Sequence, residues 1–113
     1  MSVEEELEAA QEARAEAGGI VAEVMRDVKA GRKLNAAGVK AAVRKLTETV
    51  LRNPDAALWL RRLKDKDAYS YEHAMNVSVL AIALGRHLGL PPQDLQDLGM
   101  GALLFDILSL IHI

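Results

Sequence analysis

Residues 70–88, SYEHAMNVSVLAIALGRHL, decide the class of fold. Most of their apolar side chains recur at intervals of three and four residues, the spacing of one face of an α-helix: Ala74, Val77, Leu80, Ala81, Leu84 and Leu88. Val79 and Ile82 widen this stripe, so the predicted helix is buried on more than one side. Ser70 is the predicted N-cap and Gly89 the predicted stop.

The segments on either side of this stretch also follow helical patterns. Asn35 is placed to cap a second helix, whose apolar face carries Val39, Ala42, Val43, Leu46 and Val50. Asn53 and Pro54 close that helix and open a short one with Leu58, Trp59 and Leu63 on its buried side. Downstream, a further helix begins near Gln93 and runs through the apolar residues 100–107. With only four aromatic residues and three prolines among 113, the sequence predicts an all-α fold of five or six helices.

The N-terminal segment carries a heptad seam that ends before the predicted stop at Gly31. Its positions alternate between steps of four and three: Val3, Leu7, Ala10, Arg14, Ala17, Val21, Val24 and Val28. Arg14 is the single polar interruption of this seam. Two interpretations remain open, an amphipathic helix that lies on its own domain or a coiled coil that joins domains or protomers. Because the seam has no obvious partner in the sequence, we expect self-association through this helix.

The composition excludes several classes of protein. The formal net charge of −2 argues against a basic nucleic-acid-binding surface, and the absence of cysteine excludes disulfides and zinc–thiolate sites. The chain opens with an acidic segment, so no secretory signal is expected. No stretch has the ~18 apolar residues that a membrane span needs. The expected compartment is the cytoplasm.

The candidates for chemistry are His73 and Asp106. Asp106 lies in an apolar run, where a carboxylate needs a cation, a metal ion or hydrogen-bond donors. A metal-binding role and a structural, ion-paired role are both open for it. His73 alone is more typical of a structural histidine, and His87 is interpreted as structural, near a helix C-terminus.

Two segments resemble the opening of an HD-GYP domain: residues 63–79, LKDKDAYSYEHAMNVSV, and residues 83–91, ALGRHLGLP. In that family, a helix with a metal-ligand histidine is followed by a His-Asp pair in a Leu-Leu-His-Asp-Ile-Gly-Lys motif. The matching segment here is GALLFDI, residues 101–107. Residues 53–59, NPDAALW, and the charged helix before them resemble the linker that follows an N-terminal domain of unknown function in such proteins.

The resemblance implies an all-helical bacterial phosphodiesterase that linearises cyclic di-GMP with iron or manganese ions. Such ions neutralise phosphate charge and activate a water molecule. By the same resemblance, His73 matches the first histidine ligand, and Asp106 matches the metal-binding and catalytic aspartate. We therefore expect the two side chains to lie on neighbouring helices and to point toward one another.

The sequence departs from the family pattern at several positions. Phe105 stands where the pair's histidine belongs, and Tyr69 replaces the glutamate of members with a third metal ion. The Gly-Lys that follows the motif and the Gly-Tyr-Pro segment are both absent. We expect the 113-residue chain to bind no metal and to be inactive. The alternative is a non-catalytic cyclic di-GMP receptor or protein-interaction module with a degenerate motif.

The last six residues, LSLIHI, match one reading frame of a common transposase mosaic-end adapter, CTG TCT CTT ATA CAC ATC. We expect this tail to be non-native, so His112 is not counted as a ligand and the HD-type bundle is truncated. The apolar stripe of residues 77–84 then loses the helices that would cover it. The expected organisation is a linker helix, a small helical segment, the first part of an HD-GYP domain and the tail: residues 1–31, 32–64, 65–107 and 108–113.

Overall fold

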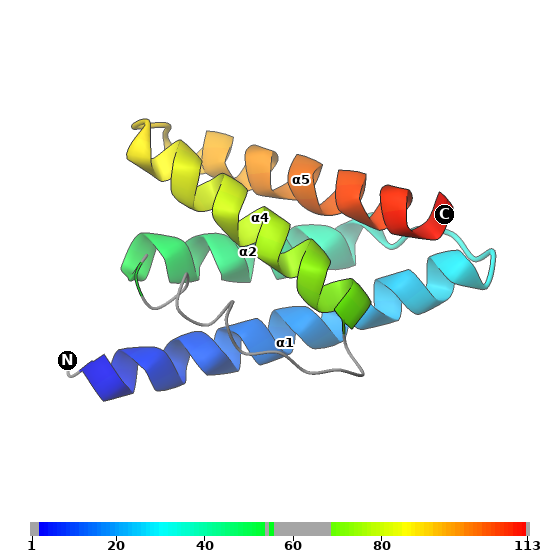
Figure 1. The fold of residues 1–113 in the computed structure, drawn as a ribbon, viewed down its shortest axis with the longest axis horizontal. Coiled ribbons are helices and arrows are strands. Elements are labelled where there is room, and N and C mark those ends of the chain that lie inside the picture. Colours follow the sequence, from blue (N-terminus) through cyan, green and yellow to red (C-terminus); the bar gives the residue numbers. More distant parts are fainter. Residues whose placement is uncertain (1–2, 54, 56–68, 113) are drawn as a thin grey trace.

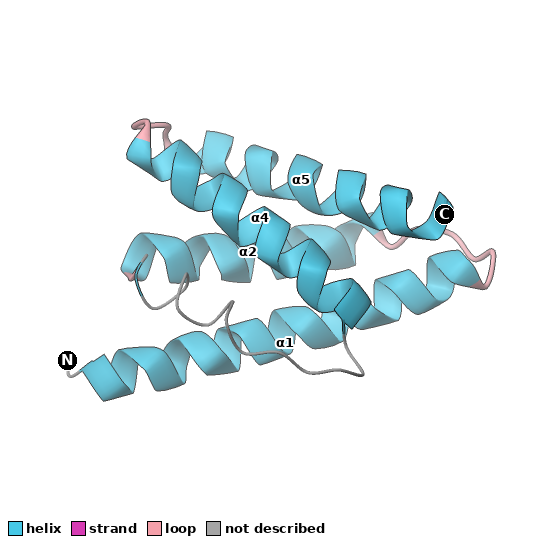
Figure 2. Ribbon diagram, in the orientation of Figure 1, coloured by secondary structure: helices cyan, strands magenta, loops and turns pink. Residues whose placement is uncertain are grey.

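The computed structural model describes residues 3–53, 55 and 69–112, and this part of the chain is helical without a strand. Figure 1 and Figure 2 show its four helices, with bounds that follow in chain order: α1 (Val3–Lys29), α2 (Ala36–Arg52), α4 (Tyr69–His87) and α5 (Pro92–His112). The all-α prediction is confirmed. The short helix expected after Pro54 lies outside the described residues, so the total of five or six helices stays a prediction.

The helices form two antiparallel hairpins that pack on each other. α1 and α2 make the first hairpin, α4 and α5 make the second, and α4 crosses in front of α2 in Figure 1. Each of the four helices contacts the other three, with the closest association inside the two hairpins. None of the described helices combines the length and the apolar character needed to cross a bilayer.

Local signals set the ends of these helices much as the sequence predicted. The Asn35 side chain accepts a hydrogen bond of 3.0 Å from the backbone N–H of Gly38, as an N-cap does. Gly31 and Gly89 have φ values of 78° and 87°, the left-handed conformation that ends helices and that glycine adopts without strain. The cap predicted at Ser70 is wrong, because helical geometry already begins at Tyr69 and places Ser70 inside α4.

One hydrophobic core joins all four helices. Its largest fully buried side chains are Val21 and Val24 of α1, Val39, Val43, Leu46 and Val50 of α2, Met75 and Ile82 of α4, and Leu95, Leu103 and Ile107 of α5. Gly99 allows the closest approach, since a Cβ atom there would lie 2.7 Å from Ile82 Cδ1 and 2.9 Å from Val43 Cγ1. A side chain at this position therefore does not fit without moving its neighbours.

The seam of α1 packs into this core. Ala17, Val21 and Val24 are at most 1% exposed and belong to the core, whereas Ala10, which is 5% exposed, forms a separate small cluster with Leu7. The fold therefore follows the interpretation of a helix that lies on its own domain. The premise that the seam has no partner in the chain is wrong, because α2, α4 and α5 supply the partners.

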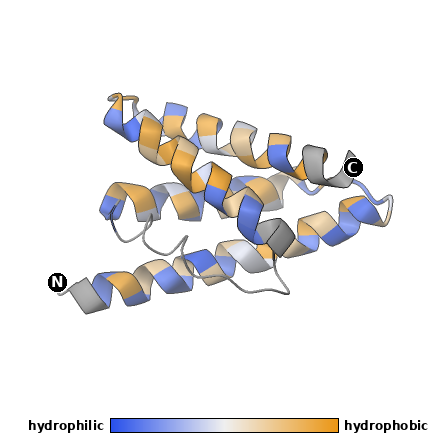
Figure 3. Cartoon of the chain, in the orientation of Figure 1, coloured by the Kyte–Doolittle hydropathy of each residue, from blue (hydrophilic) through white to orange (hydrophobic). Residues whose placement is uncertain are grey.

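The outer surface of the α4–α5 hairpin is apolar and open. We use this name for exposed large side chains of the two helices and of the turn that follows α4, where Leu88 lies: Leu80, Leu84, Leu88, Leu98, Phe105 and Leu108. Hydrophobic colour covers much of α4 on the side that faces the viewer in Figure 3. Burial of α4 on more than one side is therefore not observed. Val79 and Ile82 are buried, whereas Leu84 is 60% exposed, because the described helices cover only one side of α4.

Candidate functional site

His73 and Asp106 meet between α4 and α5, as expected. His73 Nδ1 lies 2.9 Å from Asp106 Oδ2, within hydrogen-bond distance. The carboxylate side chain is 13% exposed and the imidazole 46%, so the pair lies at the edge of the packed region with the imidazole facing solvent. The two side chains can share a proton or form an ion pair. They place one imidazole and one carboxylate at the same point of the surface.

Packing farther along the hairpin sets the relative position of the two helices. Ser78 Oγ donates a hydrogen bond of 2.9 Å to the carbonyl oxygen of Gly99. Gly85 packs against Leu95, and a Cβ atom at Gly85 would lie only 2.8 Å from Leu95 Cδ2. These contacts fix the register of α4 on α5, so residue 73 of one helix lies opposite residue 106 of the other.

A second polar cluster holds the same part of α4 to α1. Arg14 Nη2 lies 3.2 Å from Glu72 Oε2 and 2.6 Å from Asn76 Oδ1. The Arg14 and Glu72 side chains are only 10% and 19% exposed. Sequence reasoning recognised Arg14 as a polar interruption of the seam but not its partners, which lie far away along the chain. The signal that could have indicated such partners is the position of a charged residue inside an apolar seam.

The donors of a metal centre are only partly present. Imidazole and carboxylate are ligand types that iron and manganese accept, and the pair supplies one of each. Within the described ranges, no three His, Asp or Glu side chains are grouped so as to hold a metal ion. His73 and Asp106 also contact each other directly. The described residues by themselves therefore do not make a metal site.

Of the other residues singled out in the sequence, the structure describes the side chains of Phe105 and His87. Phe105 directly precedes Asp106, but its ring is 77% exposed and has no lone pair for a metal. His87 is exposed in the last turn of α4, which fits its predicted structural place near a negative helix end. The side chains of Tyr69 and His112 lie outside the described part of the chain.

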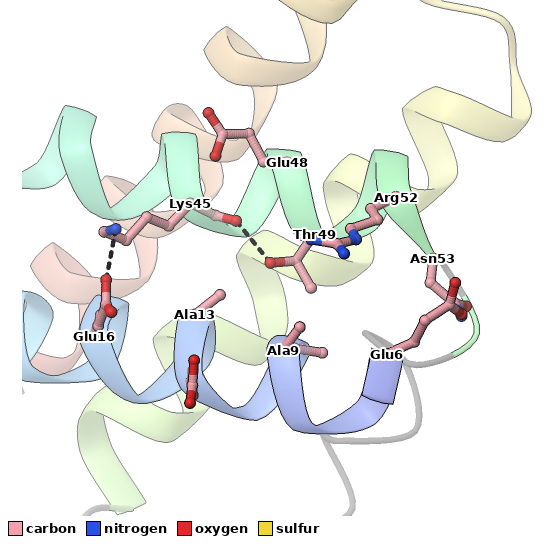
Figure 4. A pocket seen from close by; sticks show the side chains of 11 residues that line it. Glu6, Ala9, Ala13, Glu16, Lys45, Glu48, Thr49, Arg52 and Asn53 are labelled. Carbon is pink, nitrogen blue, oxygen red and sulfur yellow. Dashed lines mark hydrogen bonds and ion pairs between the residues drawn. The ribbon is translucent and has the colours of Figure 1, made fainter. Parts of the chain in front are cut away.

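A separate cavity of about 280 Å³ lies between α1 and α2. Figure 4 shows its polar lining, in which Glu16 on α1 faces Lys45 on α2 at 2.6 Å and Asn53 donates a hydrogen bond to Glu6. The pKa of Lys45 is raised above its ordinary value. The hydrogen bond to Glu16 is the largest cause, the negative charges of Glu16 and Glu48 add to it, and desolvation opposes it. Lys45 therefore stays a cation, which partly balances the acidic lining of the cavity.

The similarity of this chain to a known enzyme extends well beyond the His73–Asp106 pair. Over 107 residues, the chain is 36% identical to the cyclic di-GMP phosphodiesterase PA4108 of Pseudomonas aeruginosa. The chain resembles one part of that enzyme. The match covers 95% of this chain and 26% of PA4108, so the chain spans about a quarter of the length of its relative.

This match reaches across both hairpins, because it leaves only a few residues of the chain uncovered. It therefore supports the resemblance for the linker-like helices as well as for the motif region. No protein-family model matches the chain. No solved structure matches it either.

Proposed function

We propose that this chain is part of a bacterial HD-GYP protein that acts on cyclic di-GMP, with His73 and Asp106 as two ligands of its metal site. The 36% identity to PA4108 over nearly the whole chain carries this proposal. The contact of 2.9 Å between the two residues supports it, because ligands of one site must lie close together. A cytoplasmic location belongs to the same proposal.

In this proposal, the remaining ligands come from sequence outside these 113 residues. When bound, the iron or manganese ions supply charge neutralisation and an activated water. The part of the chain that the structure describes contributes one imidazole, one carboxylate and the packing that holds them together. The isolated chain is therefore expected to show no hydrolysis of cyclic di-GMP above background when it is loaded with manganese or ferrous iron.

A graft into the relative tests this function directly. We would replace the matching region of PA4108 with residues 1–107 and follow the linear product of cyclic di-GMP. Because Phe105 is 77% exposed, a Phe105→His substitution should leave the core intact. We expect little turnover from the unmodified graft, clear turnover from the Phe105→His graft, and loss of that turnover when His73→Ala is added.

The alternative is a non-catalytic receptor or interaction module, favoured by the phenyl ring at position 105. The same grafts separate the two functions. Binding of cyclic di-GMP without hydrolysis, also after Phe105→His, indicates the receptor. A well-folded Phe105→His graft that neither binds nor hydrolyses the nucleotide contradicts both.

A further inference from the structure

Arg14 is a charged residue in an otherwise apolar, buried seam. The residues one heptad step before and after it, Ala10 and Ala17, are 5% and 0% exposed. The Arg14 guanidinium reaches from α1 to α4, where one nitrogen atom, Nη2, contacts both Glu72 and Asn76. A buried charge is tolerated only with such partners, so the seam residue and its two acceptors form one unit.

The two acceptors lie on the same side of α4. Glu72 and Asn76 are four residues apart and so occupy successive turns of one helix face. His73 directly follows Glu72 and contacts α5 through Asp106. The first half of α4 is thus held from two directions, by Arg14 on the α1 side and by Asp106 on the α5 side.

Apolar packing and hydrogen bonds constrain a helix differently. Close packing at Gly85 and Gly99, together with the Ser78–Gly99 hydrogen bond, holds the middle and the end of α4 on α5, whereas its first turns lie beyond these contacts. Hydrogen bonds weaken steeply away from their preferred distance and angle. The guanidinium is also planar and presents its donors in a fixed geometry. Contacts to two successive turns therefore define how the first turns of α4 are rotated about the helix axis.

We infer that Arg14 is a positioning residue for the His73–Asp106 pair. By holding Glu72 and Asn76, it fixes the rotation of α4 and keeps the imidazole of His73 opposite the carboxylate of Asp106. α1 thereby takes part in building a site to which it contributes no ligand. The relevance of this role to catalysis rests on the proposed function, but the role itself is a matter of side-chain position.

Nuclear Overhauser contacts between the ring protons of His73 and the β-protons of Asp106 test this inference in the metal-free chain. The double variant Arg14→Met/Glu72→Met removes both charges and leaves no unpaired one in the core. Its matched control is Glu16→Met/Lys45→Met, which removes an ion pair between α1 and α2 that lies outside α4. We expect both proteins to keep their helix content, and only the first to lose the contacts between His73 and Asp106.

Retention of these contacts in a folded Arg14→Met/Glu72→Met protein would overturn the inference, and so would their loss in the control. If the double variant does not fold, Asn76→Ala decides the matter. It removes the acceptor on the second turn of α4 and leaves the Arg14–Glu72 ion pair in place. Weakened contacts support the positioning role and unchanged contacts overturn it. Because no metal is added, this experiment still tests the positioning role if the proposed function is wrong.

Discussion

The packed side and the outer surface of the α4–α5 hairpin are made of the same kinds of residue, but they differ in what covers them. Ile82 is 0% exposed, whereas Leu84, two positions along the same helix, is 60% exposed. On α5, Leu103 is 0% exposed and Phe105 is 77% exposed. The difference shows that hydrophobic periodicity identifies the helix, but neighbouring helices decide which of its faces is buried.

The largest expected effect is a loss of stability when a buried side chain of α4 is truncated. Truncation of an exposed side chain of the same helix is the comparison. Ile82→Ala removes buried methyl groups beside Gly99 and should lower the free energy of unfolding by about 2–5 kcal/mol. Leu84→Ala removes a similar volume from the outer surface and should change it by no more than about 0.5 kcal/mol. Urea unfolding of the two variants measures both values. Similar losses of stability in the two variants would mean that the two faces of α4 do not differ in burial in the free protein.

The buried ion pair on the α1 side of α4 gives the next largest effect. Arg14→Met removes the partly buried donor that Glu72 and Asn76 share. It should lower the free energy of unfolding by about 1.5–3 kcal/mol. Adding Glu72→Met should recover most of this loss, since apolar replacement of both members of a buried pair is often neutral. Thermal or urea unfolding of the single and double variants checks this. A double variant less stable than the single one contradicts it.

The outer surface gives a prediction about association. Among the described residues, most of the exposed large apolar side chains lie on the outer surface of the hairpin, which makes it the candidate surface for self-association. We expect the chain to self-associate at micromolar concentration and the triple variant Leu84→Ser/Leu88→Ser/Phe105→Ser to be monomeric. Light scattering decides this. The prediction fails if the unmodified chain is a monodisperse monomer.

Most of the helix ends, which depend on local chemistry, were predictable from the sequence, although the cap at Ser70 was not. The cap at Asn35 and the stops at Gly31 and Gly89 depend on residues within a single turn, and the structure has each of them. The exposure of Leu84 was expected only because the resemblance indicated a truncated bundle, and the partners of Arg14 were not predictable, because both depend on helices that are distant in sequence. The meeting of His73 and Asp106 was expected only through the family resemblance, since no local pattern connects two residues on different helices.

The smallest expected effect is the pH dependence of an exposed contact, the Lys45–Glu16 pair, which contrasts with the buried Arg14–Glu72 pair. The hydrogen bond and the negative charge of Glu16 raise the pKa of Lys45 in the folded state above its unfolded value of about 10.4. The pair therefore contributes its full stability below that unfolded value and loses it as the pH rises through the folded pKa.

The effect is small because exposed ion pairs are screened by solvent. The informative quantity is the difference in unfolding free energy between the unmodified chain and Glu16→Gln, because titrations common to both proteins cancel in it. This difference should shrink as the pH rises through the raised pKa of folded Lys45, where the ammonium loses its charge. A difference that stays constant over this rise in pH would show that Glu16 stabilises α1 against α2 without the charge of Lys45.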